Sequence, residues 1–449
     1  MPESADGGSY RRIWALAWPT LVYSVLELSL GVADFLMVRG LGSEATAAIG
    51  LNRQIAFLLE SAALAVATGV ITLVSQGVGA ENREQVDGAV RQSFRLVLLL
   101  GVPTTLVGYA ASRPLLVALQ ASPETLAHGV PYLHIYFLGT LFLWTSLVAA
   151  AVFRGTGDTL TPLKLAAGVS VLNIGLNYVF VFGAGAIPAY GVAGAAIGTV
   201  AARAIGSAVY VVLLVRGTPH ARLRPRPWMD VDWELMRRIL RIGWSPALAA
   251  IARNGARVVY LALLGIVPLG ASLHAAAGVG LQVRLVSVLP ALAFQVAAAT
   301  LVGQAVGARR YDLAQAIGQR TVLLLALIMA GVVAVTFLLA EPLAALFIVD
   351  PEVAALGATV LRWFAVAQFF SSLSIGTQGA LTGVGDTRPI FRYTIVTQWV
   401  VLLAMTLALS VGLGWVPEGA LLAWVAAPVL QLALMQRLFR SGRWRTLRV

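Results

Sequence analysis

The chain has 449 residues, of which 59% are hydrophobic and 12% are charged, whereas about 25% of the residues in an ordinary soluble domain are charged. This composition excludes a soluble fold and leaves room for about twelve membrane spans of about 20 residues each. The net charge of +12 would suggest a nucleic-acid partner in a soluble chain, but here we attribute it to membrane topology and expect no nucleic acid. No Gly-Lys pair and no cysteine occur, which excludes a P-loop and thiolate metal sites.

Apolar runs separated by glycine, proline or charged residues predict the helices. The first half contains runs at about 14–38, 51–77, 93–112, 130–152, 163–183 and 191–215. The second half contains runs at about 240–265, 273–302, 320–340, 356–380, 393–413 and 419–437. The expected fold is therefore an all-α integral membrane protein with twelve transmembrane helices.

Basic residues are distributed unequally between the two sides of the membrane that these spans define. The poorer side has little beyond Arg39, Arg53, Arg113 and Arg362, and the richer side includes Arg11, Arg12, Arg154, Arg222, Arg224, Arg226, Arg309 and Arg310. Because loops rich in Lys and Arg stay inside the cell, we expect both termini in the cytoplasm and the chain in the cell inner membrane.

An internal repeat organises the chain. The stretch LVSQGVGAENREQVDGAV, from Leu73, returns 228 residues later as LVGQAVGARRYDLAQAIG, from Leu301. The same offset relates GTGDT, from Gly155, to GVGDT, from Gly383, where we expect glycine to permit a tight turn and aspartate to cap the next helix.

Each half has six spans, so the repeat predicts two six-helix bundles related by a pseudo-twofold axis along the membrane normal. The expected organisation is an amino-terminal lobe at 1–215, a cytoplasmic linker at 216–238 and a carboxyl-terminal lobe at 239–449. A pair of bundles around a cleft is the geometry that alternating-access transport requires.

The repeated motifs resemble those of the multidrug and toxic compound extrusion (MATE) family. The resemblance extends to the first span, WPTLVYSVLELSLGVADFLMVRGLGSEATAAIGL, and to NIGLNYVFVFGAGAIPAYGVAGAAIGT from Asn173, and it covers about residues 12–437. It implies an exporter that expels organic, usually cationic, compounds in exchange for protons or sodium ions. Such a protein has no catalytic residues and no resident cofactor.

The resemblance also suggests functional positions. The acidic residue of the family's first helix corresponds to Asp34, whereas the acidic positions of the NorM-like branch on helices seven and ten hold Asn254 and Ser371 here. The DinF-like branch has an Asn and an Asp on helix five, and those positions hold Asn173 and Asn177. These departures place the expected coupling site in the first lobe, as in the DinF-like branch.

Three acidic residues lie within apolar spans of the first half: Glu27, Asp34 and Glu60. Ionisable groups within a bilayer are costly and are functional candidates. For Glu27 and Glu60 the alternative is a structural ion pair with Arg203, which lies at a similar estimated depth. Either of the two could instead contact the substrate in the cleft.

Asp34 has no arginine at its own estimated depth, although Arg53 could reach it from nearer the mouth. Asn177 and Thr199 lie at similar depths, and Asn173 shares a helical face with Asn177. These residues predict a coupling site for a proton, or for sodium held at Asp34, and a simple interhelical hydrogen-bonding role is the alternative for each asparagine.

The second half carries embedded positive charge instead, at Arg253, Arg257 and Arg284. One interpretation is a site for an anionic group. The other is that these arginines pair with backbone carbonyls or with Glu27 and Glu60 across the cleft.

The favoured function is ion-coupled efflux by a monomer whose partners are a small-molecule substrate and membrane lipid. A flippase for lipids or lipid-linked sugars of related architecture is the alternative, because arginines in the second lobe would suit an anionic headgroup. An intramembrane enzyme is disfavoured, since neither HExxH nor GxSxG occurs. A passive channel would not need two lobes.

Overall fold

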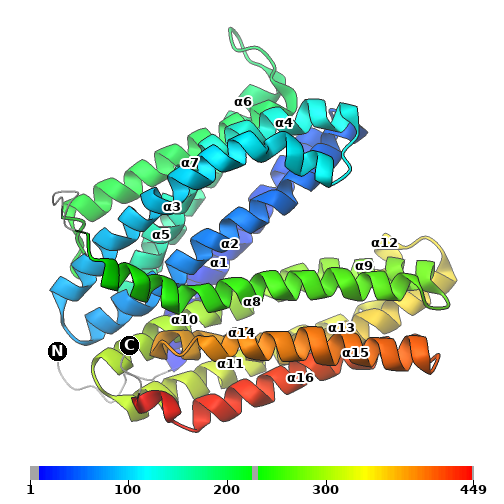
Figure 1. Cartoon of the computed structure of the whole chain (residues 1–449). Coiled ribbons are helices and arrows are strands. Elements are labelled where there is room, and N and C mark those ends of the chain that lie inside the picture. The colour runs from blue at the N-terminus through cyan, green and yellow to red at the C-terminus, as the bar shows by residue number, and fades with distance from the viewer. Residues whose placement is uncertain (1–9, 225–230, 447–449) are drawn as a thin grey trace. The chain divides into compact units, whose positions relative to one another are not determined.

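The computed structural model describes residues 10–224 and 231–446, so Arg226, expected in the cytoplasm, lies outside the described residues. The described chain is almost entirely helical. The helices of the first half are α1 (Tyr10–Arg39), α2 (Ser43–Gly79), α3 (Arg83–Ala118), α4 (Pro123–Leu138), α5 (Thr140–Thr156), α6 (Leu160–Phe182) and α7 (Gly191–Arg216) (Figure 1).

The second half repeats this pattern with more interruptions. Its helices are α8 (Trp233–Gly265), α9 (Gly270–Ser287), α10 (Leu289–Gly307), α11 (Tyr311–Leu338), α12 (Ala340–Phe347), α13 (Pro351–Val384), α14 (Arg388–Thr394), α15 (Leu403–Thr406) and α16 (Glu418–Arg440). The π-helical segments η1 (Ile395–Leu402) and η2 (Leu407–Gly412) flank α15, and the 3-10 turn η3 (Arg443–Thr446) follows α16.

Among the described residues, 11 helical segments are long and apolar enough to cross a membrane, or up to 12 if a bent pair counts as one span. The bent pair is α4 and α5, which meet at 51° around Gly139 where the sequence predicts one span. A Cβ on Gly139 would lie 2.4 Å from Val200 Cγ2, so the close approach of α7 requires glycine at this bend. The all-helical membrane fold is confirmed.

The chain forms two compact units, and their boundaries fall within helices. Unit 1 comprises Met1–Leu21 with Ser245–Val449, and unit 2 comprises Val22–Trp244. Helices α1 and α8 each begin in one unit and end in the other. The lobes expected at 1–215 and 239–449 stay a prediction.

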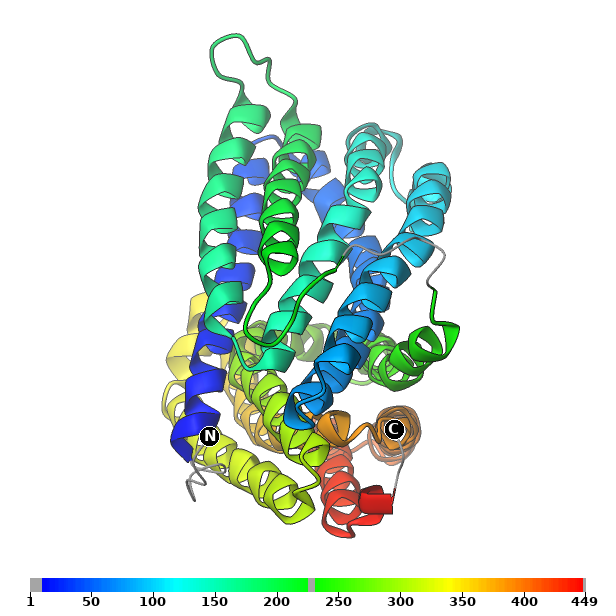
Figure 2. The same cartoon turned by 90° about the vertical axis from the view of Figure 1, so that its left-hand side faces the viewer.

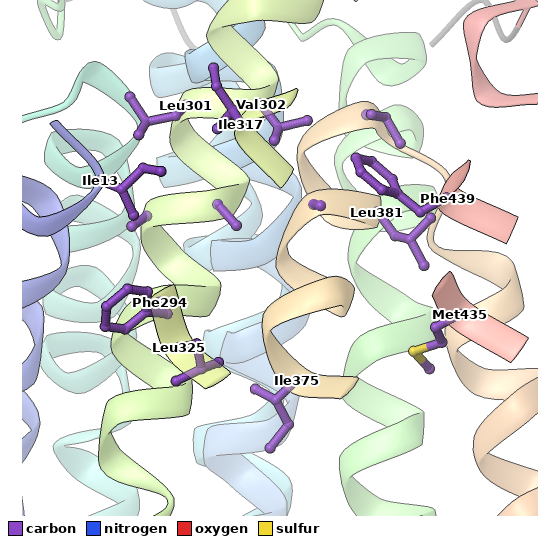
Figure 3. Close-up of a cluster of buried hydrophobic side chains, with 14 of the residues drawn as sticks. Ile13, Phe294, Leu301, Val302, Ile317, Leu325, Ile375, Leu381, Met435 and Phe439 are labelled. Carbon is purple, nitrogen blue, oxygen red and sulfur yellow. The ribbon is translucent and has the colours of Figure 1, made fainter. Parts of the chain in front are cut away.

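Apolar packing holds unit 1 together around α10 and α13. Its largest described core joins the first turns of α1 to α10, α11, α13 and α16, through residues that include Ile13, Phe294, Leu325, Leu381 and Phe439 (Figure 3). All five side chains are almost completely buried. The amino-terminal turns of α1 therefore belong to a core built mainly from the second half of the chain.

Close backbone contact joins α2 to the start of α8 within unit 2. A Cβ on Gly243 would lie 1.6 Å from the carbonyl oxygen of Ala65, and one on Gly69 would lie 2.1 Å from that of Ile239. Only glycine fits at these two positions.

The two repeated loops, GTGDT and GVGDT, both contain the predicted glycine turn, but only the first has the predicted aspartate cap. Gly157 and Gly385 end their helices at φ 92° and 85°, and Asp158 Oδ1 accepts a hydrogen bond from the Thr161 amide at 2.9 Å, which confirms the predicted cap. Asp386 cannot repeat this bond, because the residue three positions later is Pro389, which has no amide N–H to donate. Burial raises the pKa of the Asp386 carboxyl. The connection between α6 and α7 extends beyond the helix ends (Figure 2).

Candidate functional site

A cavity of about 440 Å³ opens within unit 2. Four helices line it: α1, α2, α4 and α7. The residues on its wall include all three embedded acidic residues predicted from the sequence, Glu27, Asp34 and Glu60, together with Arg53, Tyr132, Tyr136, Thr199 and Arg203. Its volume lies in the range of pockets that hold drug-sized molecules.

The helical repeat of α1 brings its functional residues to one wall of the cavity. Glu27, Gly31 and Asp34 are spaced four and three residues apart, so they share one helical face. The glycine between the two carboxylates has a packing role, because a Cβ on Gly31 would lie 2.5 Å from Arg53 Nη2. Arg53 on α2 therefore lies directly against α1, and it interacts electrostatically with Asp34.

A chain of hydrogen bonds connects Asp34 to α6 and α7. Asn177 Nδ2 donates to Asp34 Oδ1 at 2.7 Å and to Asn173 Oδ1 at 3.0 Å. Asn173 Nδ2 then donates to Thr199 Oγ1 at 3.1 Å. Both asparagines are fully buried. The four residues predicted for coupling are thus brought together, although their role stays a proposal.

Gly198 on α7 shapes this network without contributing a side chain. A Cβ at this position would lie 2.1 Å from Asn177 Oδ1 and 2.7 Å from the Asn177 backbone nitrogen. The absence of a side chain at Gly198 therefore allows Asn177 to occupy its place between Asp34 and Asn173. The sequence analysis did not identify this residue, and its only signal is a glycine next to Thr199.

Arg203 on α7 forms the ion pair expected from its depth. Its Nη2 lies 2.7 Å from Glu27 Oε2, and the two side chains are 18% and 31% exposed. Of the two pairings of Arg203 that the sequence left open, the structure shows the one with Glu27. Glu60 is held differently, since its Oε1 accepts a hydrogen bond from the Tyr136 hydroxyl at 3.2 Å.

Two tyrosines of α4 complete the cavity, and the sequence analysis missed both. The rings of Tyr132 and Tyr136 stack with centroids 6.1 Å apart. Their spacing of four residues places them on one helical face, which is a signal too common in membrane helices to indicate a site by itself. Aromatic faces beside carboxylates provide a favourable surface for organic cations.

The cavity wall carries a small excess of negative charge. It carries the carboxylates of Glu27, Asp34 and Glu60 against the guanidinium groups of Arg53 and Arg203, which is three negative and two positive charges, or −1 when all are ionised. Within residues 10–224 and 231–446, no group of three or more His, Cys, Asp or Glu side chains could hold a metal ion.

A family model for MatE matches residues 19–179 and 248–407, which include most of both repeats. The chain belongs to the MatE family. MatE proteins are membrane transporters and not enzymes, so the family resemblance noted in the sequence is confirmed. The matched segments include Asp34, Asn173 and Asn177.

Two relatives and one solved structure match most or nearly all of the chain. A probable multidrug resistance protein NorM of Thermotoga maritima is 26% identical over 96% of this chain and 92% of its own length. The multidrug resistance protein MdtK of Pectobacterium atrosepticum is 29% identical over 87% and 85%. A transporter of the MOP superfamily from Pyrococcus furiosus shares the fold, with a TM-score of 0.87, 22% identity and 96% coverage of both chains.

Unit 1 of this MatE protein contains the other predicted site residues, at Arg253, Asn254, Arg257, Arg284 and Ser371. Arg253 Nη1 donates to Gln378 Oε1 at 3.3 Å. For Asn254 and Ser371, the described chain shows no side-chain hydrogen bond. No single hydrogen-bond network in the described chain joins these five residues, in contrast to the network around Asp34.

Proposed function

We propose that this MatE protein exports organic cations from the cell in exchange for protons or sodium ions, and that Asp34 is the coupling residue. The single observation that carries the proposal is the position of Asp34. Its carboxylate lies on the wall of a drug-sized cavity and accepts a 2.7 Å hydrogen bond from buried Asn177. Relatives named as a probable multidrug resistance protein NorM and a multidrug resistance protein MdtK support the export of drugs.

Exchange needs one group whose affinity for the ion depends on its surroundings. Removal of water from a carboxyl favours its neutral form, whereas a nearby cation favours its charged form. A proton at Asp34 and an organic cation in the same cavity therefore compete, because protonation removes one of the three negative charges that attract the cation. Release of either ligand to one side of the membrane prepares the site for the other.

The neighbours of Asp34 suit this role. Asn177 is a neutral donor, so it stabilises the charged carboxylate without a permanent ion pair that would prevent protonation. Glu27 already has Arg203 as its partner at 2.7 Å, which makes it a structural charge. A sodium ion, if used, would take oxygen ligands from Asp34, Asn173 and Thr199, since hard cations prefer oxygen.

We further propose that the protein acts as a monomer in the inner membrane of the cell, with both termini in the cytoplasm. The bacterial relatives and the excess of arginine on one side of the predicted spans support this arrangement.

The test is transport by purified protein in proteoliposomes, with the fluorescent cation ethidium as the substrate. A pH gradient and a sodium gradient are applied separately to the wild type, to Asp34→Asn and to Asp312→Asn. Asp312 is the control because its side chain is 94% exposed. We expect Asp34→Asn to abolish gradient-driven transport while the protein still inserts and elutes as a single species, and Asp312→Asn to transport normally.

Transport by Asp34→Asn at the wild-type rate and with the wild-type pH dependence would overturn the assignment. The gradient that drives the wild-type protein identifies the coupling ion. If neither gradient drives ethidium, the proposed exchange of organic cations is wrong.

A further inference from the structure

A cluster of arginines in unit 1 has no role in the proposed exchange. Arg253 and Arg257 lie one turn apart on α8, and Arg284 lies on α9. Arg284 interacts electrostatically with both, and Arg253 interacts with Arg257. Each of these interactions joins two positive charges, so the three guanidinium groups repel one another.

No carboxylate of the described residues forms an ion pair with any of these arginines. The described acidic residues of unit 1 lie in loops or in the first turns of helices: Asp312, Glu341, Asp350, Glu352, Asp386 and Glu418. Where those acids meet an arginine, they do pair, as Arg362 does with Glu341 at 2.9 Å and Arg445 with Asp312 at 2.9 Å. Unlike Arg362 and Arg445, the three embedded arginines have no carboxylate partner among the described residues.

The repeat makes the charge difference between the halves explicit. The 228-residue offset relates Asp34 to Ala262 and Glu60 to Val288. The second half therefore lacks both carboxylates and has three arginines along the same stretch of helices. Arginines within apolar helices cost free energy, because their charged groups are removed from water.

Hydrogen bonding leaves most of the cluster's donors available. A guanidinium group has five N–H donors, and the structure gives Arg253 one side-chain partner, the Gln378 oxygen at 3.3 Å. For Arg257 and Arg284, no hydrogen bond is present in the described part of the chain. Each of the three residues is partly exposed.

The surroundings of Arg284 are mostly apolar. It lines a small cavity with Val283, Met329, Leu361 and Phe364. The cavity has a volume of about 10 Å³, which is space for about one water molecule. This cavity is too small to hold an anionic group, so such a group has to bind at the guanidinium groups themselves. Apolar side chains would then lie beside it.

We propose that Arg253, Arg257 and Arg284 form a binding site for a phosphate-type oxyanion carried by an amphipathic molecule. Phosphate oxygens accept paired hydrogen bonds from guanidinium forks, and a group with one or two negative charges relieves the repulsion within the cluster. The oxyanion comes either from the headgroup of an anionic membrane lipid or from a soluble organic phosphate. This site shares no residue with the Asp34 cavity and does not depend on the proposed cation exchange.

The test measures thermal unfolding of the full chain in a zwitterionic detergent, with added dioleoylphosphatidylglycerol, dioleoylphosphatidylcholine or phenyl phosphate. The variants are Arg257→Gln, Arg284→Gln, Arg284→Lys and Arg362→Gln. Arg362 is the matched control, since it lies in the same unit but pairs with Glu341 at the exposed surface. Titration of the wild type gives an apparent affinity for each anion.

We expect the anion to raise the melting temperature of the wild type and of Arg362→Gln. Loss of a guanidinium should weaken the apparent affinity by about tenfold or more, which corresponds to the roughly 1.5–3 kcal/mol of a hydrogen bond to a charged group. Arg284→Lys should retain part of the affinity because it retains the charge. Without anion, Arg257→Gln should melt at or above the wild-type temperature, because it removes repulsion.

Three results would overturn the proposal. The first is an equal shift for the wild type and for both Gln variants. The second is no shift with either anion, or an equal shift with phosphatidylcholine. The third is a lower melting temperature of both Gln variants without anion, which would show that the arginines already have a partner in the protein. A response to phosphatidylglycerol alone assigns the oxyanion to a lipid, and a response to phenyl phosphate assigns it to a soluble phosphate.

Discussion

A single added methyl group at Gly198 should disconnect Asp34 from its hydrogen-bond network. The Cβ of Gly198→Ala would lie 2.1 Å from Asn177 Oδ1, and ordinary contact begins at 3.4 Å, so the oxygen has to retreat by about 1.3 Å. Oδ1 and Nδ2 belong to one planar amide, so a retreat of Oδ1 also moves or rotates the Nδ2 that donates to Asp34 at 2.7 Å. A hydrogen bond weakens steeply when its distance and angle are lost. The backbone nitrogen of Asn177, at 2.7 Å, also restricts any local repacking.

The expected magnitudes follow from these distances. Overpacking of this kind costs about 1–3 kcal/mol of folding free energy. Loss of a hydrogen bond to a charged group costs about 1.5–3 kcal/mol, which is roughly a tenfold to hundredfold change in the ion affinity of Asp34. We therefore expect Gly198→Ala to fold but to show a displaced pH dependence of transport.

The assay is gradient-driven ethidium transport in proteoliposomes across a series of external pH values. Gly175→Ala is the matched control, because Gly175 lies on α6 between Asn173 and Asn177 and its Cβ would meet nothing within 4 Å. The same transport rate and pH profile in Gly198→Ala as in Gly175→Ala and the wild type would show that the Asn177 contact has no influence on Asp34.

Three further predictions concern other parts of the chain. Glu27→Gln should destabilise the protein by about 1–3 kcal/mol in thermal unfolding, because it leaves the Arg203 guanidinium without its ion pair. The Glu341 side chain is 74% exposed, so Glu341→Gln should cost less than about 1 kcal/mol. Equal effects of the two substitutions would contradict the structural role of Glu27. Asn254→Ala and Ser371→Ala should keep the gradient dependence of transport, since neither side chain titrates near neutral pH; loss of that dependence at normal expression would place the ion site in unit 1. A cysteine introduced as Arg224→Cys, in a chain that has no cysteine, should react with a membrane-impermeant maleimide only from the cytoplasmic side, and labelling from outside intact cells would refute the topology.

The spans and the repeat could be predicted from the sequence because hydropathy depends only on local composition. The bend at Gly139 could not, because the side chain that excludes a Cβ there is Val200 of α7, a residue 61 positions away. Local patterns do not report such a tertiary contact.

The site was predictable to a similar degree. The depth of Arg203 within its helix indicated a partner such as Glu27, and the family position indicated Asp34. Tyr136 and Gly198 could not be found in this way, because a tyrosine or a glycine in a membrane helix gives no signal until the neighbouring helix is known. Helix depth grouped Asn173, Asn177 and Thr199 with Asp34, but the hydrogen bonds among them depend on the packing of α6 against α7 and could not be predicted.

The division of α1 between the two units has a consequence for biosynthesis. Ile13, Leu16 and Ala17 leave the ribosome before their core partners Phe294 and Leu301, which are made only after α8 and α9. Unit 2, Val22–Trp244, is one uninterrupted segment and has all its residues by the time Trp244 is synthesised. The core of unit 1 cannot pack until the second half of the chain has entered the membrane. The first turns of α1 therefore contact lipid or an insertion factor while the remaining helices are synthesised.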